Sequence, residues 1–184
     1  MNATTTTLLS FAEFQRLYED EPCVELVEGL AVRNPMATRE HGRVCYKFTL
    51  ALGNFVEAHD LGHIFTNDSY VRIRHDPDTV LRPDVQFISY ARLPRDANLW
   101  ELTDAAPELA VEVRSPSNAW AELARKAELY LGVGVLAVLV LKIDDRTATV
   151  FRRNELNQVF DNGDTFTLPD VLPGFAVPVS AFFA

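Results

Sequence analysis

Cysteine is scarce in this sequence. Its 184 residues include only two, Cys23 and Cys45, which lie far apart and outside any CxxC pair. A disulfide framework or a structural zinc site needs more cysteines at short, paired spacings, so the sequence argues against both. We expect two buried, reduced thiols.

Long hydrophobic runs are also missing. The longest, Val133 to Leu141, is interrupted by Gly134, and it is far shorter than the roughly 20 residues that span a bilayer. This run predicts a buried strand and no membrane partner. The N-terminal sequence MNATTTTLLSFAEF has no basic residue before its short apolar stretch, which is untypical of a secretory signal. We therefore expect a cytoplasmic protein.

The sequence shows no internal repeat, low-complexity tract or long linker, and its 48% hydrophobic residues can form the core of one domain. We expect a single domain over residues 1–184. The expected helices begin at Ser10, at Thr38, and at Ser117 or Asn118, and the first and third end near Glu19 and Leu131. The expected extended segments are 24–32 (two strands turning at 28–29), 64–73, 85–89, 108–115 and 135–141, with turns at 75–78, 144–145 and 162–163. This order predicts an α/β fold.

Positive charge is in short supply, because the formal net charge is -9. Such a balance opposes indiscriminate nucleic-acid binding, which depends on neutralising phosphates. The segment from Arg33 to Arg95 is the exception, with nine basic and seven acidic residues. Any phosphate-facing surface should come from this segment, although its arginines could simply be solvated.

One carboxylate lies inside an apolar segment. Glu112 belongs to the predicted strand LAVEVR, where an unpaired buried charge would be costly. Because strand side chains alternate, Glu112 and Arg114 share one face and the apolar residues share the other. An ion pair between these two residues at the sheet surface is the simplest interpretation, and a functional carboxylate is the alternative.

Two further residues favour the functional alternative. Asp84 follows a proline and directly precedes the apolar segment VQFI, so it stands at the start of a predicted core strand. Lys126 lies on the helix after the glutamate's strand, with Glu122 and Tyr130 one turn to either side. Alone, the first could be a turn signal and the second an exposed Glu–Lys helix pair.

Together, Asp84, Glu112 and Lys126 have the chemistry for phosphodiester hydrolysis. Carboxylates suit Mg²⁺ or Mn²⁺, with water and a backbone carbonyl, here that of Val113, completing the shell. The cation offsets charge that develops on the phosphate and lowers the pKa of water, and a nearby lysine positions or deprotonates that water. These residues form the predicted catalytic site.

Three segments in this order, RPDVQFIS, PELAVEVRSPSN and KAELYLGVGV, resemble the Uma-two family, a branch of the PD-(D/E)XK restriction-endonuclease-like superfamily. The resemblance continues through VELVEGLAV, EHGRV and the closing LPGFAVPVSAFF, so it covers essentially the whole chain. It implies a restriction-endonuclease-like α/β core, a mixed β-sheet flanked by helices with additional antiparallel strands. It also implies a metal-dependent endonuclease acting on DNA.

The resemblance also implies roles for individual residues. Asp84 would be the acidic residue of the PD motif and Glu112 that of the second motif, both holding metal. Lys126 would replace the lysine that the superfamily places two residues after that glutamate. Glu25 and His41 would be neighbours of the site, although Glu25 could equally be a surface charge of a hairpin and His41 a core-edge histidine.

Some positions depart from the family pattern. An apolar residue is usual at position 114, whereas Arg114 could bind the scissile phosphate, pair with a carboxylate, or crowd out the metal. Glu122 replaces an aspartate early in the helix, and Leu139 replaces an aromatic residue on the next strand. These departures keep open a nuclease-derived binding or regulatory module without activity. A third alternative is a structural domain that oligomerises through its apolar C-terminal segment.

A nucleic-acid surface is predicted around the first turns of the second helix. Arg39 and Arg43 flank His41 there, and Arg82 stands two residues before Asp84. A helix N-terminus favours anions, so these arginines are the expected phosphate contacts. We expect a homodimer, because cutting two strands suits a symmetric pair.

Overall fold

The computed structural model describes residues 8–21, 23–66, 69–100, 103–114 and 119–184. In chain order the elements are α1 (Phe11–Tyr18), β1 (Val24–Val27), β2 (Leu30–Arg33), α2 (Arg39–Ala58), β3 (Gly62–Thr66), β4 (Val71–His75), β5 (Asp78–Leu81), β6 (Val85–Ser89), β7 (Leu109–Arg114), α3 (Trp120–Gly132), β8 (Ala137–Lys142), β9 (Thr147–Phe151), β10 (Gln158–Phe160), β11 (Thr165–Leu168), β12 (Leu172–Pro178) and the 3₁₀ helix η1 (Val179–Phe182). Among the described helices, none combines the length and hydrophobicity needed to cross a bilayer.

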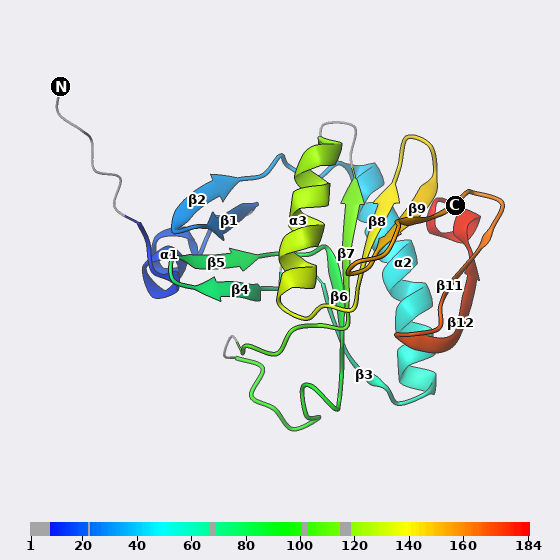
Figure 1. The fold of residues 1–184 in the computed structure, drawn as a ribbon, viewed down its shortest axis with the longest axis horizontal. Coiled ribbons are helices and arrows are strands. Elements are labelled where there is room, and N and C mark those ends of the chain that lie inside the picture. The colour runs from blue at the N-terminus through cyan, green and yellow to red at the C-terminus, as the bar shows by residue number, and fades with distance from the viewer. Residues whose placement is uncertain (1–7, 22, 67–68, 101–102, 115–118) are drawn as a thin grey trace.

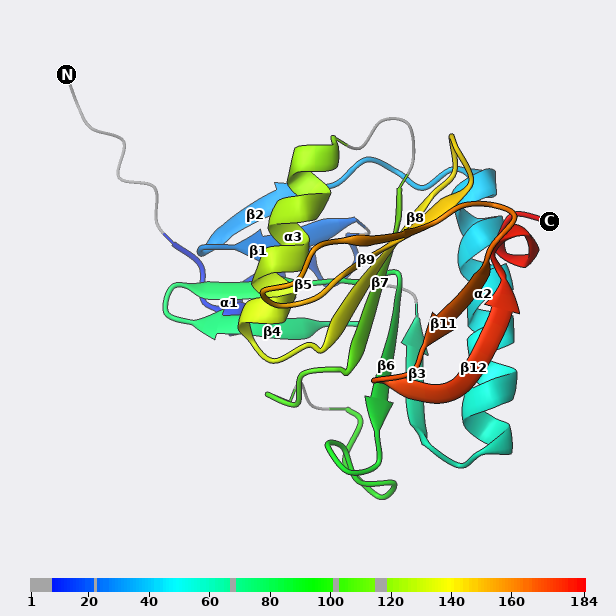
Figure 2. The same ribbon diagram turned by 45° about the vertical axis from the view of Figure 1, so that its right-hand side comes forward.

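A six-stranded sheet in the order β10-β9-β8-β7-β6-β3 forms the centre of the molecule. Its strands β7 and β8 are parallel, and their described neighbours pair antiparallel. Parallel neighbours need a crossover connection, which α3 supplies here. Figures 1 and 2 show α3 on one side of this sheet and α2 on the other. The predicted mixed α/β architecture is confirmed.

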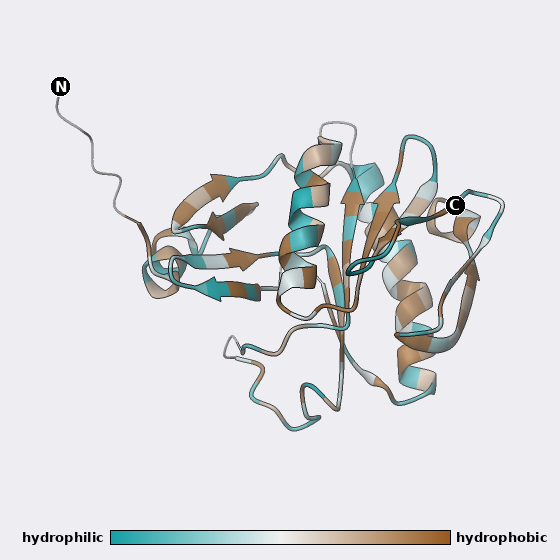
Figure 3. Cartoon of the chain, in the orientation of Figure 1, coloured by the Kyte–Doolittle hydropathy of each residue, from teal (hydrophilic) through white to brown (hydrophobic). Residues whose placement is uncertain are grey.

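The side chains of β7 alternate between two hydrophobic clusters, one on each face of the central sheet. Leu109, Val111 and Val113 pack with the buried stripe of α2, whereas Ala110 packs with the buried face of α3. The hydrophobic stretches of the central strands and α2 are brown in Figure 3. Glu112 therefore points from the α3 face, as alternation predicts.

The helix starts follow from capping chemistry. Ser10 and Glu13 form the reciprocal capping box that opens α1, and the Thr38 hydroxyl accepts the His41 N–H at the start of α2 (3.2 Å). Both predicted caps are confirmed. The third helix differs, because its N-cap is Ala119, which has no side-chain oxygen to offer. The predicted caps Ser117 and Asn118 lie outside the described residues.

The segment predicted as one extended stretch at 64–73 is two strands in different sheets. Strand β3 ends at Thr66 and pairs with β6, whereas β4 begins at Val71 and pairs with β5 in a four-stranded sheet ordered β2-β1-β5-β4. Strand β5 was missed because it is only four residues long and lies between two prolines. The turn at 162–163 likewise joins β10 and β11 of different sheets, and it is β11 and β12 that pair.

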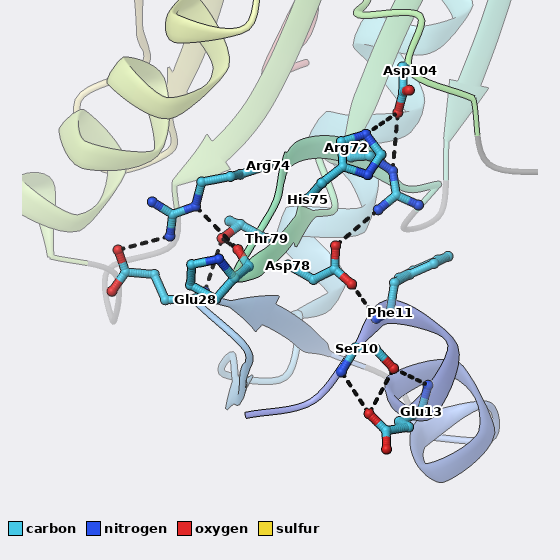
Figure 4. A network of polar contacts seen from close by, with 11 residues as sticks. Ser10, Phe11, Glu13, Glu28, Arg72, Arg74, His75, Asp78, Thr79 and Asp104 are labelled. Atoms are coloured by element: carbon cyan, nitrogen blue, oxygen red, sulfur yellow. Dashed lines mark hydrogen bonds and ion pairs between the residues drawn. The ribbon is translucent and has the colours of Figure 1, made fainter. Parts of the chain in front are cut away.

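A polar network ties α1 to the β4–β5 hairpin (Figure 4). The Asp78 carboxylate accepts the Phe11 N–H (2.6 Å) and an Arg72 N–H (3.2 Å). Arg72 also pairs with Asp104 (3.2 Å), and Arg74 pairs with Glu28 of the β1–β2 turn (3.2 Å). These contacts hold α1 and the β1–β2 turn against the β4–β5 hairpin, and Arg72 links the hairpin to Asp104, which precedes β7.

Candidate active site

The start of β6 brings Asp84 next to β7. Val85 lies opposite Val111 in the antiparallel pair, so Asp84, one residue before the first regular pair, comes opposite Glu112. The regular pairing ends there, and the Asp84 carboxylate accepts the Val113 N–H instead (Oδ2–N 2.6 Å). Asp84 and Glu112 consequently line one cleft.

A buried hydrogen-bond network surrounds Glu112, which is only 6% exposed. Its Oε1 accepts the Tyr130 hydroxyl (2.9 Å) and lies 3.6 Å from Lys126 Nζ. Lys126 donates to Glu25 Oε1 of β1 (2.9 Å), and the same oxygen accepts the backbone N–H of Arg82 (2.9 Å). One ammonium thus joins α3, β1 and β7.

The charges in this network shift the pKa values of its members. Burial raises the pKa of Glu112 to about 8; Lys126 opposes the shift, and the nearby carboxylates of Asp84 and Glu25 add to it. Burial disfavours the Lys126 ammonium, yet Glu112 and Glu25 outweigh it and raise the lysine pKa. Burial, and then Glu112, also raises the pKa of Tyr130. Lys126 is therefore charged in the folded protein at neutral pH.

His41 faces the site from the first turn of α2. Its Nε2 lies 3.3 Å from Asp84 Oδ2, and its Nδ1 lies 3.5 Å from Cys45 Sγ, one turn along the helix. Burial works against the protonated imidazole, but the hydrogen bond and charge of Asp84 prevail and raise the His41 pKa. His41 therefore contacts Asp84 and lines the same cleft.

His41, Asp84, Glu112 and Lys126 line a cleft of about 480 Å³ between α2, α3, the start of β6 and the end of β7. Its lining residues are Cys23, Asn34, Pro35, Met36, Ala37, His41, Gly42, Cys45, Tyr46, Thr49, Thr66, Arg82, Asp84, Glu112, Val113, Glu122, Leu123 and Lys126. The cleft is large enough for part of an extended substrate.

The donor set fits a hard divalent cation. Three carboxylates, those of Glu25, Asp84 and Glu112, gather around a single lysine. The uncompensated negative charge contributes to the raised pKa of Glu112, and a cation in the cleft would relieve it. Asp84 and Glu112 offer the oxygen atoms that Mg²⁺ and Mn²⁺ prefer. Val113, whose carbonyl was predicted as a further ligand, also lines the cleft.

The simpler interpretations of the sequence are wrong at three positions. Glu112 binds Tyr130 and Lys126, whereas Arg114 binds Asp144 (2.8 Å). Lys126 is 7% exposed and therefore forms no surface pair. Glu25, at 1% exposed, is not a surface charge of the hairpin. Of the three roles considered for Arg114, the structure shows pairing with a carboxylate.

The three arginines predicted to contact phosphate lie in different surroundings. Arg39 is exposed on the first turn of α2. Arg43 pairs with Glu40 and donates to the Phe183 carbonyl (3.0 Å). Arg82 lines the cleft, with its guanidinium 4.5 Å from the centre of the Tyr70 ring. Of these three, Arg82 is placed to meet a ligand in the cleft.

The two thiols lie where the sequence did not predict them. Cys23 and Cys45 were predicted to be buried, but both are half-buried free thiols that line the cleft. For Cys45 a signal was available, because it follows His41 by four residues and so shares its face of the helix. Cys23 is brought there by chain packing that no local pattern indicates.

The model of the Uma2 family, described as "Putative restriction endonuclease", matches residues 11–180. The crystal structure of a "putative nuclease belonging to DUF820" from Anabaena variabilis superimposes with a TM-score of 0.80 at 21% identity, covering 95% of this chain and 97% of that one. The fold is thus restriction-endonuclease-like, as predicted. A DrdV–DNA complex gives a TM-score of only 0.39 at 14% identity, covering 77% of this chain and 14% of the other. No protein with a curated description matches the sequence.

Proposed function

Because this chain belongs to the Uma2 family, described as "Putative restriction endonuclease", we propose that it is a metal-dependent endonuclease that cleaves DNA at the cleft of Asp84, Glu112 and Lys126. The family and the structural neighbour support nuclease function. The observation that carries the proposal is the convergence of Lys126 with Glu25, Glu112 and, through the shared cleft, Asp84. This acidic cleft contains the residues that phosphodiester cleavage by a metal nuclease needs.

Asp84 and Glu112 would hold Mg²⁺ or Mn²⁺. A cation held there supplies Lewis-acid stabilisation of phosphate charge and acidifies water. Hydrolysis would join a water oxygen to phosphorus and break one phosphorus–ester oxygen bond; the attacking water would release one proton to solvent in the cleft, and the departing oxygen would take one up from solvent. The Val113 N–H orients Asp84 through its hydrogen bond, and Tyr130 orients Glu112.

Lys126 would act as a charged hydrogen-bond donor. Its pKa is raised by Glu112 and Glu25, so it keeps its protons near neutral pH rather than accepting one from water. Two of its three N–H groups can serve these carboxylates. The side chain also lines the cleft, so the third N–H can hold a water or a phosphate oxygen in the reacting position.

The experiment is cleavage of supercoiled DNA by the full chain in EDTA, Mg²⁺ or Mn²⁺. We expect nicking or linearisation only with the cations, and loss of cleavage by at least 100-fold in Asp84→Asn and Lys126→Met, since electrostatic groups of this kind contribute about that much. Arg125→Met is the matched control, because Arg125 is exposed on the same helix as Lys126. A linear product would also support the proposed homodimer.

Two results would contradict this function, and a third would contradict the role of Lys126. Cleavage in EDTA would show that the reaction needs no divalent cation. DNA binding in Ca²⁺ without cleavage in Mg²⁺ or Mn²⁺ would instead identify a nuclease-derived binding module. Equal residual activity in Lys126→Met and Arg125→Met would return the lysine to a structural role.

A further inference from the structure

A second group of donor atoms lies on the α2 side of the cleft. His41 and Cys45 are four residues apart on α2 and so face the same way. One donor atom from each of His41, Cys45 and Asp84 lies within 4.8 Å of the other two. All three side chains line the cleft and are half-buried.

The spacing between the His41 and Cys45 donor atoms fits a tetrahedral cation, whereas Asp84 Oδ2 lies 3.3 Å from the other ring nitrogen, His41 Nε2, so the Asp84 carboxylate would have to turn toward Nδ1 to complete the site. Zinc bonds of about 2.3 Å to sulfur and 2.0–2.1 Å to nitrogen place the two donor atoms about 3.6 Å apart at a tetrahedral angle. His41 Nδ1 and Cys45 Sγ lie 3.5 Å apart. A weak hydrogen bond between the thiol and the imidazole gives a similar distance. Adding metal distinguishes this hydrogen bond from a pair of metal ligands.

We propose that His41, Cys45 and Asp84 bind a second cation of intermediate softness, Zn²⁺ or Co²⁺, with Asp84 serving both this site and the Mg²⁺ site. Thiolate and imidazole favour such ions, whereas Mg²⁺ prefers oxygen ligands. Three protein ligands leave a coordination position for a ligand, the pattern of catalytic rather than structural zinc. The scarcity of cysteine argued against a closed structural zinc site, and this open site needs only one.

The second cation would serve the reaction through its charge. The chain carries a formal net charge of -9, and the cleft gathers carboxylates where a phosphate must approach. A second divalent cation would attract the phosphate and neutralise the transition state, as paired cations do in many nucleases. The inference rests on the proposed function for this role, whereas binding of the cation can be measured separately.

The test is a Co²⁺ titration of the chelator-treated full chain, followed by absorption. A cobalt–thiolate bond gives a near-ultraviolet charge-transfer band that oxygen and nitrogen ligands lack. In the wild type we expect the band to saturate at one equivalent of Co²⁺. Cys45→Ser should lose the band, and His41→Gln should bind Co²⁺ at least ten-fold more weakly. Cys23→Ser is the matched control, because Cys23 lines the same cleft outside the donor group, and this variant should retain the band. Circular dichroism checks the fold of each variant.

Co²⁺ binding without a thiolate band, or a band that is lost in Cys23→Ser and kept in Cys45→Ser, would overturn the inference. Mg²⁺-dependent cleavage by the wild type is measured on the same preparation. Cleavage without the band overturns the second site alone. The band without cleavage in either Mg²⁺ or Mn²⁺ supports the second site as a binding site and overturns the proposed function.

Discussion

Lys126 compensates the buried Glu25 carboxylate (2.9 Å) and lies 3.6 Å from Glu112. Removing one partner of a buried ion pair typically costs about 3–5 kcal/mol, because a charge is left without compensation. Lys126→Met should therefore lower the free energy of unfolding by roughly that amount, measured by urea denaturation at pH 8 without metal. The exposed Arg125→Met should change it by less than about 0.5 kcal/mol. Equal effects of the two substitutions would contradict the buried network.

Glu112 should make the stability of the metal-free protein depend on pH. Its pKa rises on folding from 4.5 to about 8, so the folded protein binds its proton more tightly. This contribution is complete below pH 4.5 and is lost as the pH rises to about 8. The wild type should therefore lose stability relative to Glu112→Gln across this window, as measured by urea unfolding in EDTA. A difference between the two proteins that stays constant with pH would refute the shift.

Some of these residues could be predicted from local sequence patterns and others could not. The position of Glu112 in an apolar strand and of Asp84 before one are local patterns, so both were predicted, as was the place of Lys126 on the next helix. Glu25 is 101 positions from Lys126, and no periodicity reveals that contact. The sequence resemblance alone pointed to Glu25.

Substitutions at two helix caps can distinguish an effect on stability from an effect on the geometry of the site. Thr38 caps α2 by accepting the His41 N–H, whereas Ser10 caps α1 within the remote network of Figure 4. Each change to alanine should cost about 1 kcal/mol of stability, measured by thermal unfolding. Only Thr38→Ala should also weaken Mn²⁺ binding, because His41 contacts Asp84 from the first turn of α2. Equal Mn²⁺ affinities in the two variants would show that the α2 cap does not position the site.

The elements also show what local patterns can and cannot predict. Helices α1 and α2 were predicted because their caps and apolar spacing are local. The division of 64–73 between two sheets depends on pairing with β6 and β5, which lie elsewhere in the chain. Short strands acquire their place from such partners, so their register could not be predicted.

DNA binding by the whole molecule should depend on divalent cations, because the net charge of -9 repels phosphate. We expect binding in Ca²⁺ that weakens with added salt and is at least five-fold weaker in Arg82→Ala, measured by fluorescence anisotropy. Arg153→Ala is the control, since Arg153 is exposed and does not line the cleft. Equal binding with and without Ca²⁺, or an unchanged affinity in Arg82→Ala, would contradict this electrostatic account.

The central claim is that Asp84 and Glu112 hold one catalytic cation. A crystal of the full chain soaked in Mn²⁺ tests it directly through the anomalous scattering of manganese. The account predicts a manganese peak in contact with both carboxylates in the wild type and no such peak in Asp84→Asn. A saturating soak that leaves the cleft without a peak, or that places manganese away from both carboxylates, would contradict it.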